Sequence, residues 1–116
     1  MPTKEYERRL DTTGAEWLRV RFTTERGQLT IFTVQYETTV EAQTWPVIRY
    51  DSAHGFAHVD VLAPDGSQVS KRPLPDYLTL DQAFQLGITD IVQNWKTYRE
   101  RFWEAGNDDS TRARSR

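Results

Sequence analysis

Apolar and polar residues alternate with a period of two through much of the chain before residue 73, a pattern that predicts β-strands. In the first clear strand, Leu18, Val20 and Phe22 fall on one face and arginines on the other. The segments with this alternation or with strand-favouring composition are residues 17–24, 29–38, 44–51, 56–62 and 67–72. Short turns separate them, so we expect one antiparallel meander of about five strands.

The first eleven residues are charged and weakly patterned. Tyr6, Arg8 and Leu10 alternate with Glu7 and Arg9, which is typical of a short edge strand. The same composition also suits a loose arm, and the sequence leaves both alternatives open.

After residue 78 the apolar period changes to that of a helix. Thr79 and Gln82 have the spacing of a capping box, in which each side chain bonds the backbone N–H of the other residue. Large apolar residues then recur at spacings of three and four, namely Phe84, Ile88, Ile91, Trp95, Tyr98 and Phe102. This stripe predicts a long helix packed on one face of the sheet, with Trp95 deeply buried against it. Gly106 is the expected C-cap.

The predicted helix is longer than the strands that it covers. It spans about 40 Å at about 1.5 Å per residue, whereas a seven-residue strand covers about 23 Å. We therefore expect its last turns, with Tyr98, Phe102 and Trp103, to overhang the sheet and expose an aromatic surface. Beyond them the chain is polar, so we expect one α+β domain over residues 1–106 and a disordered tail over residues 107–116.

Composition excludes several classes of protein. The chain has 116 residues and a net charge of −2, which excludes a global positive field that attracts nucleic acid. It has no cysteine, which excludes a disulfide and a thiolate metal site. Hydrophobic residues make up 37%, enough for one core. No apolar run approaches the ~20 residues of a membrane span. We expect a cytoplasmic protein without a membrane partner.

Residues 47–62 hold both histidines and are predicted to form a β-hairpin with a turn at residues 52–55. A four-residue loop sets the register of the hairpin, pairing Asp51 with Phe56, Arg49 with His58 and Val47 with Asp60. The face away from the core then gathers polar side chains that can carry chemistry. These are Arg49, Asp51, His58 and Asp60, with His54 at the tip.

Three interpretations of this cluster stay open. An imidazole transfers protons near neutral pH, a carboxylate can orient it, and Arg49 can meet a phosphate, which suits RNA cleavage. We assign the catalytic role to His58, His54, Arg49, Asp51 and Asp60. Alternatively, His58 and Asp60 bind a metal, completed by His54 or Asp51. The third interpretation is a solvated face in which Arg49 pairs diagonally with Asp60. We expect no cofactor and assign no metal ligand.

Arg19 and Arg21 also point away from the predicted core. If their strand lies near the hairpin, they share a surface with Arg49 and can hold a nucleic-acid backbone, so we assign them to substrate binding. The alternative is ordinary surface charge paired with neighbouring glutamates.

Two resemblances follow from these residues. The Trp-Leu-Arg-Val-Arg-Phe strand, the Arg-Tyr-Asp-x-x-His-Gly-x-x-His hairpin and the Asn-Trp…Tyr-Arg pattern of the helix together resemble an uncharacterised family of small bacterial α+β proteins. More distantly, Arg49-Tyr50-Asp51 followed by His54 and His58 is similar to the Arg-Tyr-Asp-Asn…His…His segment of TumE-type toxins of toxin–antitoxin pairs. That resemblance implies a short α+β toxin with a histidine-bearing hairpin.

From the residues and the resemblance together we expect a toxin–antitoxin-like protein, similar to a ribonuclease, that acts on RNA through the His/Arg/Asp hairpin site. The alternative is a non-enzymatic protein-interaction module that uses the open sheet face and the aromatic helix end. The expected partners are RNA, an antitoxin-like protein and a second copy of the chain in a homodimer.

Overall fold

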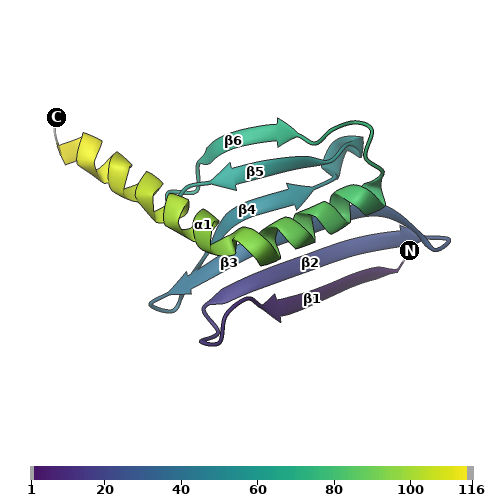
Figure 1. Cartoon of the computed structure of the whole chain (residues 1–116), viewed down its shortest axis with the longest axis horizontal. Helices are drawn as coiled ribbons and strands as arrows, with labels where there is room; N and C mark the ends of the chain where they lie inside the picture. The colour runs from purple at the N-terminus through teal and green to yellow at the C-terminus, as the bar shows by residue number, and fades with distance from the viewer. Residues whose placement is uncertain (1, 115–116) are drawn as a thin grey trace.

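Six antiparallel strands form one sheet in which spatial order follows chain order (Figure 1). A computed structural model describes the backbone of residues 2–114 and the side chains of residues 2–53 and 55–106. The strands are β1 (Thr3–Arg9), β2 (Glu16–Glu25), β3 (Gln28–Val40), β4 (Gln43–Asp51), β5 (His58–Leu62) and β6 (Gln68–Pro73). The α+β meander is confirmed, although its strands number six and not five.

The additional strand is β1, so the N-terminal segment is an edge strand and not a loose arm. Every residue of β1 is exposed, and polar contacts hold it against β2. Glu7 lies 2.8 Å from Arg19, Glu5 lies 3.9 Å from Arg21, and the hydroxyls of Thr3 and Thr23 are 2.9 Å apart. The apolar alternation of this segment is weak because ion pairs and hydrogen bonds with β2, and not burial, hold the strand in the sheet.

One long helix, α1 (Leu80–Arg114), crosses one face of the sheet above β2, β3 and β4 (Figure 1). The predicted capping box is present: the Thr79 N–H donates to Gln82 Oε1 at 2.9 Å, and the Gln82 N–H donates to Thr79 Oγ1 at 3.1 Å. Among the described residues no helix has the length and apolar character that crossing a membrane takes.

The core lies between α1 and the central strands. Alternate residues of β2, β3 and β4 are buried, beginning with Leu18, Val20 and Val34 at 0% exposure. From the helix, Ile91 and Phe102 are the large side chains buried deepest. Gly87 brings α1 close to β4, because a Cβ there would lie 2.9 Å from the Tyr50 ring.

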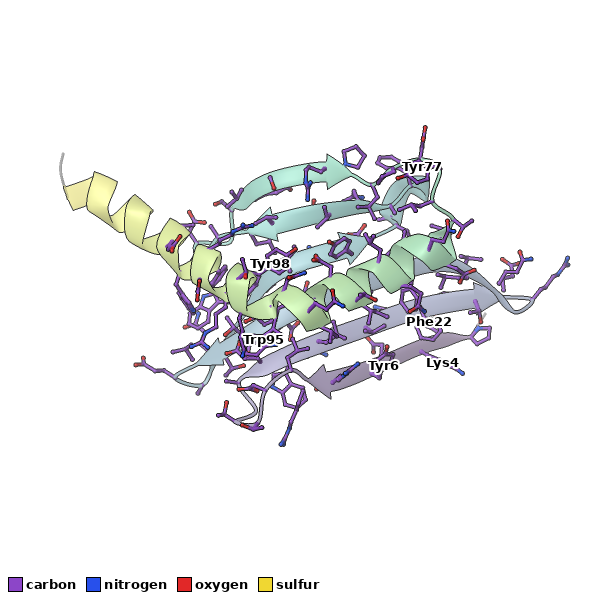
Figure 2. The ribbon with its side chains drawn as sticks, viewed as in Figure 1. Lys4, Tyr6, Phe22, Tyr77, Trp95 and Tyr98 are labelled. Carbon is purple, nitrogen blue, oxygen red and sulfur yellow. The ribbon has the colours of Figure 1, made fainter. Side chains whose placement is uncertain are left out.

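Trp95 is not the deeply buried residue that we expected. It is half-buried and packs against the ring of Tyr36, with ring centroids 6.2 Å apart. Tyr36 itself is fully buried and fills the space above β3. In Figure 2, Trp95 and Tyr98 lie on opposite flanks of the helix, so the deepest line of the stripe runs between them, through Ile91.

The far part of the helix also differs from expectation. The helix continues through Gly106, so this glycine is not a C-cap. It lies so close to Pro64 that a Cβ would meet the proline ring at 2.9 Å, and glycine therefore permits this close contact. Phe102 is 2% exposed, Trp103 packs edge-on against Trp45 at 5.4 Å, and Tyr98 and Trp103 are half-buried, so most of the predicted aromatic surface is covered. The disorder expected for residues 107–116 stays a prediction, since their side chains lie outside the described part of the structure.

Candidate functional site

The hairpin of β4 and β5 displays its polar residues on the sheet face opposite α1, the open face. The register pairs Asp51 with His58 and Arg49 with Asp60. The faces are as predicted, but each partner differs by two positions from the predicted register. An even displacement leaves every side chain on its expected face, so only the pairing was wrong.

The loop between the two strands explains the displaced register. Ser52 remains bound to β3: its N–H donates to the Phe32 carbonyl at 3.1 Å, and its Oγ accepts the Phe32 N–H at 2.9 Å. The chain then turns through a 3-10 helix, Ala53–Gly55, with Gly55 at φ +88°. The loop therefore contains six residues, 52–57, where a four-residue turn was predicted.

Asp51, His58 and Asp60 form a compact group, here called the hairpin cluster. His58 Nε2 lies 3.2 Å from Asp51 Oδ1 and 3.5 Å from Asp60 Oδ2. The Ala53 N–H donates to Asp51 Oδ1 at 3.0 Å, which fixes that carboxylate at the end of β4. The side chains are 4% exposed for His58, 10% for Asp60 and 15% for Asp51, so the carboxylates are the outer groups and the imidazole is the inner one.

Two polar atoms of the hairpin cluster have no hydrogen-bond partner among the described residues. They are Nδ1 of His58 and Oδ1 of Asp60, both buried. The ring of Phe56 is tilted toward the imidazole, with ring centroids 6.0 Å apart. Buried polar groups in proteins are almost always satisfied, so these two atoms mark the cluster as unusual.

Arg49 belongs to a line of polar side chains that crosses all six strands at matching register positions, here called the polar row. Its members are Glu7, Arg19, Gln35, Arg49, Asp60 and Lys71. Arg49 Nε donates to Gln35 Oε1 at 2.6 Å, away from Asp60. The diagonal ion pair between Arg49 and Asp60 is therefore absent from the described side chains.

Arg19 and Arg21 lie on the open face, as predicted, but carboxylates pair with them. Arg19 lies 2.8 Å from Glu7 and 3.1 Å from Glu37. The hydrogen bond that Arg19 donates to Glu37, together with the charge of that carboxylate, raises the pKa of Arg19 above its ordinary value. These pairs neutralise the arginines nearest β1, so Arg49 and Lys71 carry the positive charge beside the hairpin cluster.

The other assigned residue, His54, has its backbone in the 3-10 turn. Its side chain lies outside the described part of the structure, so its distance from the cluster stays a prediction.

Sequence reasoning missed a second polar group, on the helix side of the sheet. Tyr50 and Tyr98 both donate to Asp90 Oδ2, at 2.5 and 2.6 Å, and Asn94 donates to Oδ1 at 2.8 Å. Burial and the bond to Asp90 raise the pKa of Tyr98 to about 12, and the same causes raise that of Tyr50 still further. The spacing of four between Asp90, Asn94 and Tyr98 was the available signal. Both phenols are neutral donors; the Tyr50 hydrogen bond ties β4 to α1, whereas the Tyr98 hydrogen bond lies within α1.

Sequence reasoning also missed Lys71. It stands directly opposite Asp60 on β6 and is exposed. The turn at residues 63–66 made this pairing accessible from the sequence, because a meander places the two strands side by side.

Comparison with known proteins yields one family. A model of a domain of unknown function, DUF7718, matches residues 1–108. No curated protein and no solved structure matches the chain. The family description names no activity, so the resemblance to TumE-type toxins stays a prediction. With 108 of 116 residues inside the match, the chain belongs to the DUF7718 family.

Proposed function

We propose that the protein acts on RNA at the hairpin cluster, as a toxin–antitoxin-like ribonuclease. The observation that supports this most is the approach of one imidazole nitrogen to two carboxylates, within 3.2 and 3.5 Å, beside two cations of the polar row. Groups that transfer protons and cations that meet a phosphate are the parts that 2′-hydroxyl attack on a phosphodiester needs.

We base the roles of the three groups in this proposal on their burial. Asp51 has the most exposed side chain of the cluster at 15%, so it meets the substrate 2′-hydroxyl and accepts its proton. The 2′-oxygen bonds to phosphorus as the P–O5′ bond breaks, and the departing 5′-oxygen takes a proton from water. His58 lies behind it, with Nε2 3.2 Å from Asp51 Oδ1, and positions that carboxylate. This order differs from the expected one, in which the histidine faced the substrate.

The two cations beside the cluster have separate roles in this proposal. Arg49 and Lys71 flank Asp60 from β4 and β6 at the same register position. A guanidinium can bind two phosphate oxygens in one plane, whereas an ammonium acts as a point charge. Arg49 therefore orients the scissile phosphate and Lys71 attracts the strand.

Cleavage of labelled RNA by the purified protein tests the proposal. We expect Asp51→Asn and His58→Gln to lower the rate by at least about 100-fold, as expected for loss of an acid–base group. Arg49→Lys should lower it less. Glu41→Gln is the matched control, because Glu41 is an exposed carboxylate in the turn at the other end of β4. If neither wild type nor variants cleave RNA, and expression of both leaves growth and cellular RNA intact, the proposal fails.

A second candidate function is protein binding without catalysis, and uncovered apolar side chains near β6 favour it. Val69 is 58% exposed and Phe56 is 56% exposed; Tyr77, at the connection from β6 to α1, is 80% exposed (Figure 2). Because β6 is an edge strand, a partner strand can pair with it. The aromatic helix end does not contribute, since its side chains are packed.

The size of the protein in solution tests this second candidate, with a second copy as the partner. Light scattering at high micromolar concentration should give a dimer mass for the wild type and for His58→Gln, and a monomer mass for Val69→Asp. A monomer mass for the wild type would count against pairing through β6 with itself.

A further inference from the structure

Two distances within the hairpin cluster, both from the His58 imidazole to a carboxylate oxygen, match those between ligand atoms around one metal ion. Zinc and similar ions bind nitrogen and oxygen at about 2.0–2.2 Å, so neighbouring ligands lie about 2.8–3.6 Å apart. His58 Nε2 lies 3.2 Å from Asp51 Oδ1 and 3.5 Å from Asp60 Oδ2. One potential ligand atom from each of the three residues lies within 4.8 Å of the others.

We propose that Asp51, His58 and Asp60 bind one divalent transition-metal ion, Mn²⁺ or Zn²⁺. This inference goes beyond action on RNA and does not depend on it; Asp51 Oδ1 would be the metal ligand, which leaves the other carboxylate oxygen of Asp51 to accept the substrate proton. All three ligands come from β4 and β5, whose register holds Asp51 directly opposite His58 and Asp60 two residues farther along β5. Rigid neighbouring strands therefore fix the site before any ion binds.

Unpartnered buried atoms support the site independently of the distances. His58 is 3% exposed and Asp60 is 7% exposed, and Asp60 Oδ1 has no partner among the described residues. Within the described side chains, His58 is the one basic group within ion-pair distance of Asp60. Two carboxylates thus share one imidazole in a buried place. Arg49 and Lys71 stand opposite Asp60 on the neighbouring strands, but neither lies within ion-pair distance of it, so a divalent ion would compensate the two carboxylates directly.

The polar surroundings favour an ion at this position and not an ion pair with a neighbouring strand. The Arg49 Nε on one side of Asp60 donates to Gln35, and Lys71 on the other side is exposed to solvent. The Ala53 N–H donates to Asp51 Oδ1 at 3.0 Å and orients that carboxylate. Hydrogen bonds of this kind commonly hold metal ligands in position.

The ligand types select the class of ion. Imidazole suits zinc and other transition metals, and carboxylates suit manganese, whereas magnesium prefers oxygen ligands and retains its water. One imidazole with two carboxylates therefore favours Mn²⁺ or Zn²⁺ over Mg²⁺. Three protein ligands leave a coordination position open, as catalytic zinc sites do.

Equilibrium dialysis of the full chain against Mn²⁺, Zn²⁺ and Mg²⁺ separately, followed by elemental analysis, tests the site. We expect one Mn²⁺ or Zn²⁺ per chain in the wild type and in the control Glu41→Gln. His58→Gln and Asp60→Asn should each weaken binding by at least about 100-fold, beyond the ~10–100-fold of outer-sphere partners. Uptake by Asp60→Asn equal to that of the wild type overturns the site, and so does no uptake by the wild type.

Thermal melting of the same proteins guards against a variant that fails to fold. Metal should raise the melting temperature of the wild type and of Glu41→Gln by several degrees and leave that of Asp60→Asn unchanged. The metal-free Asp60→Asn protein should melt at or above the wild-type temperature. An equal metal-induced rise in Asp60→Asn would overturn the site. Metal uptake without RNA cleavage removes only the RNA proposal, and RNA cleavage without metal uptake removes only this inference.

Discussion

The two faces of the sheet are built from the same strands but are held by different forces. On the face covered by α1, Leu18, Val20 and Val34 are fully buried, and the apolar pattern alone placed them. On the open face, ion pairs and hydrogen bonds connect neighbouring strands, from Glu7 through Arg19 to Glu37. Burial is non-directional, whereas a polar contact depends on which residue stands opposite. The apolar pattern of the covered face therefore specifies the fold. The polar contacts of the open face form only when the register of the strands places the right residues opposite each other.

The covered face should respond most strongly to substitution. Ile91 is 0% exposed and lies where α1 meets the sheet, so Ile91→Ala should lower the free energy of unfolding by about 2–5 kcal/mol. Leu86→Ala is the control on the exposed side of the same helix, at 43% exposure, and should stay within about 0.5 kcal/mol. Urea unfolding of both measures the difference, and similar losses would show that the helix does not cover the core as described.

A substitution at Gly87, where α1 passes close to β4, should have the next largest effect on the free energy of unfolding. In Gly87→Ala, the new Cβ would meet the Tyr50 ring at 2.9 Å, and this overpacking should cost about 1–3 kcal/mol despite the better helix propensity of alanine. Urea unfolding measures it. A gain in stability would mean that α1 moves away from β4 at little cost.

Alkaline pH should destabilise the protein through the covered face, where Tyr50 and Tyr98 donate to Asp90. The pKa of Tyr98 is raised to about 12 in the folded protein, and Tyr50 shifts in the same direction. The unfolded chain releases these protons near pH 10, so this stability is fully present below about pH 10 and is lost as pH rises through the folded pKa. Unfolding midpoints between pH 9 and pH 12 should fall, and they should fall less steeply in Tyr98→Phe.

Surface ion pairs on the open face should matter least for stability. Arg19 and Glu7 are 47% and 45% exposed, and solvent screens such pairs, so Glu7→Gln should change the free energy of unfolding by less than about 1 kcal/mol. A loss of several kcal/mol would show that the polar row stabilises the fold and would weaken the contrast between the faces.

The same contrast explains what the sequence could predict. The alternation of Leu18, Val20 and Phe22 and the Thr79–Gln82 box depend on local spacing, and the structure confirms both. The sequence left β1 undecided because ion pairs with the next strand hold it, and the alternation of apolar residues does not reveal such pairs. The burial of Trp95 was overestimated, because spacing identifies a helix face but not its deepest line.

For the candidate site, the sequence predicted the face but not the contacts. Asp51, His58 and Asp60 share the open face, as alternation requires. Their pairing depended on the length of the loop, and the bonds from Ser52 to Phe32 that lengthen it have no local signal. The turn of Arg49 toward Gln35 is likewise a tertiary contact.

The stability of metal-free Asp60→Asn tests most directly whether the hairpin cluster serves chemistry rather than folding. The substitution keeps the shape of the side chain and removes one buried charge whose Oδ1 has no partner among the described residues. A functional cluster predicts a free energy of unfolding within about 1 kcal/mol of the wild type, or above it, in urea at neutral pH. A loss of about 3 kcal/mol or more, as when a buried ion pair is broken, would contradict it.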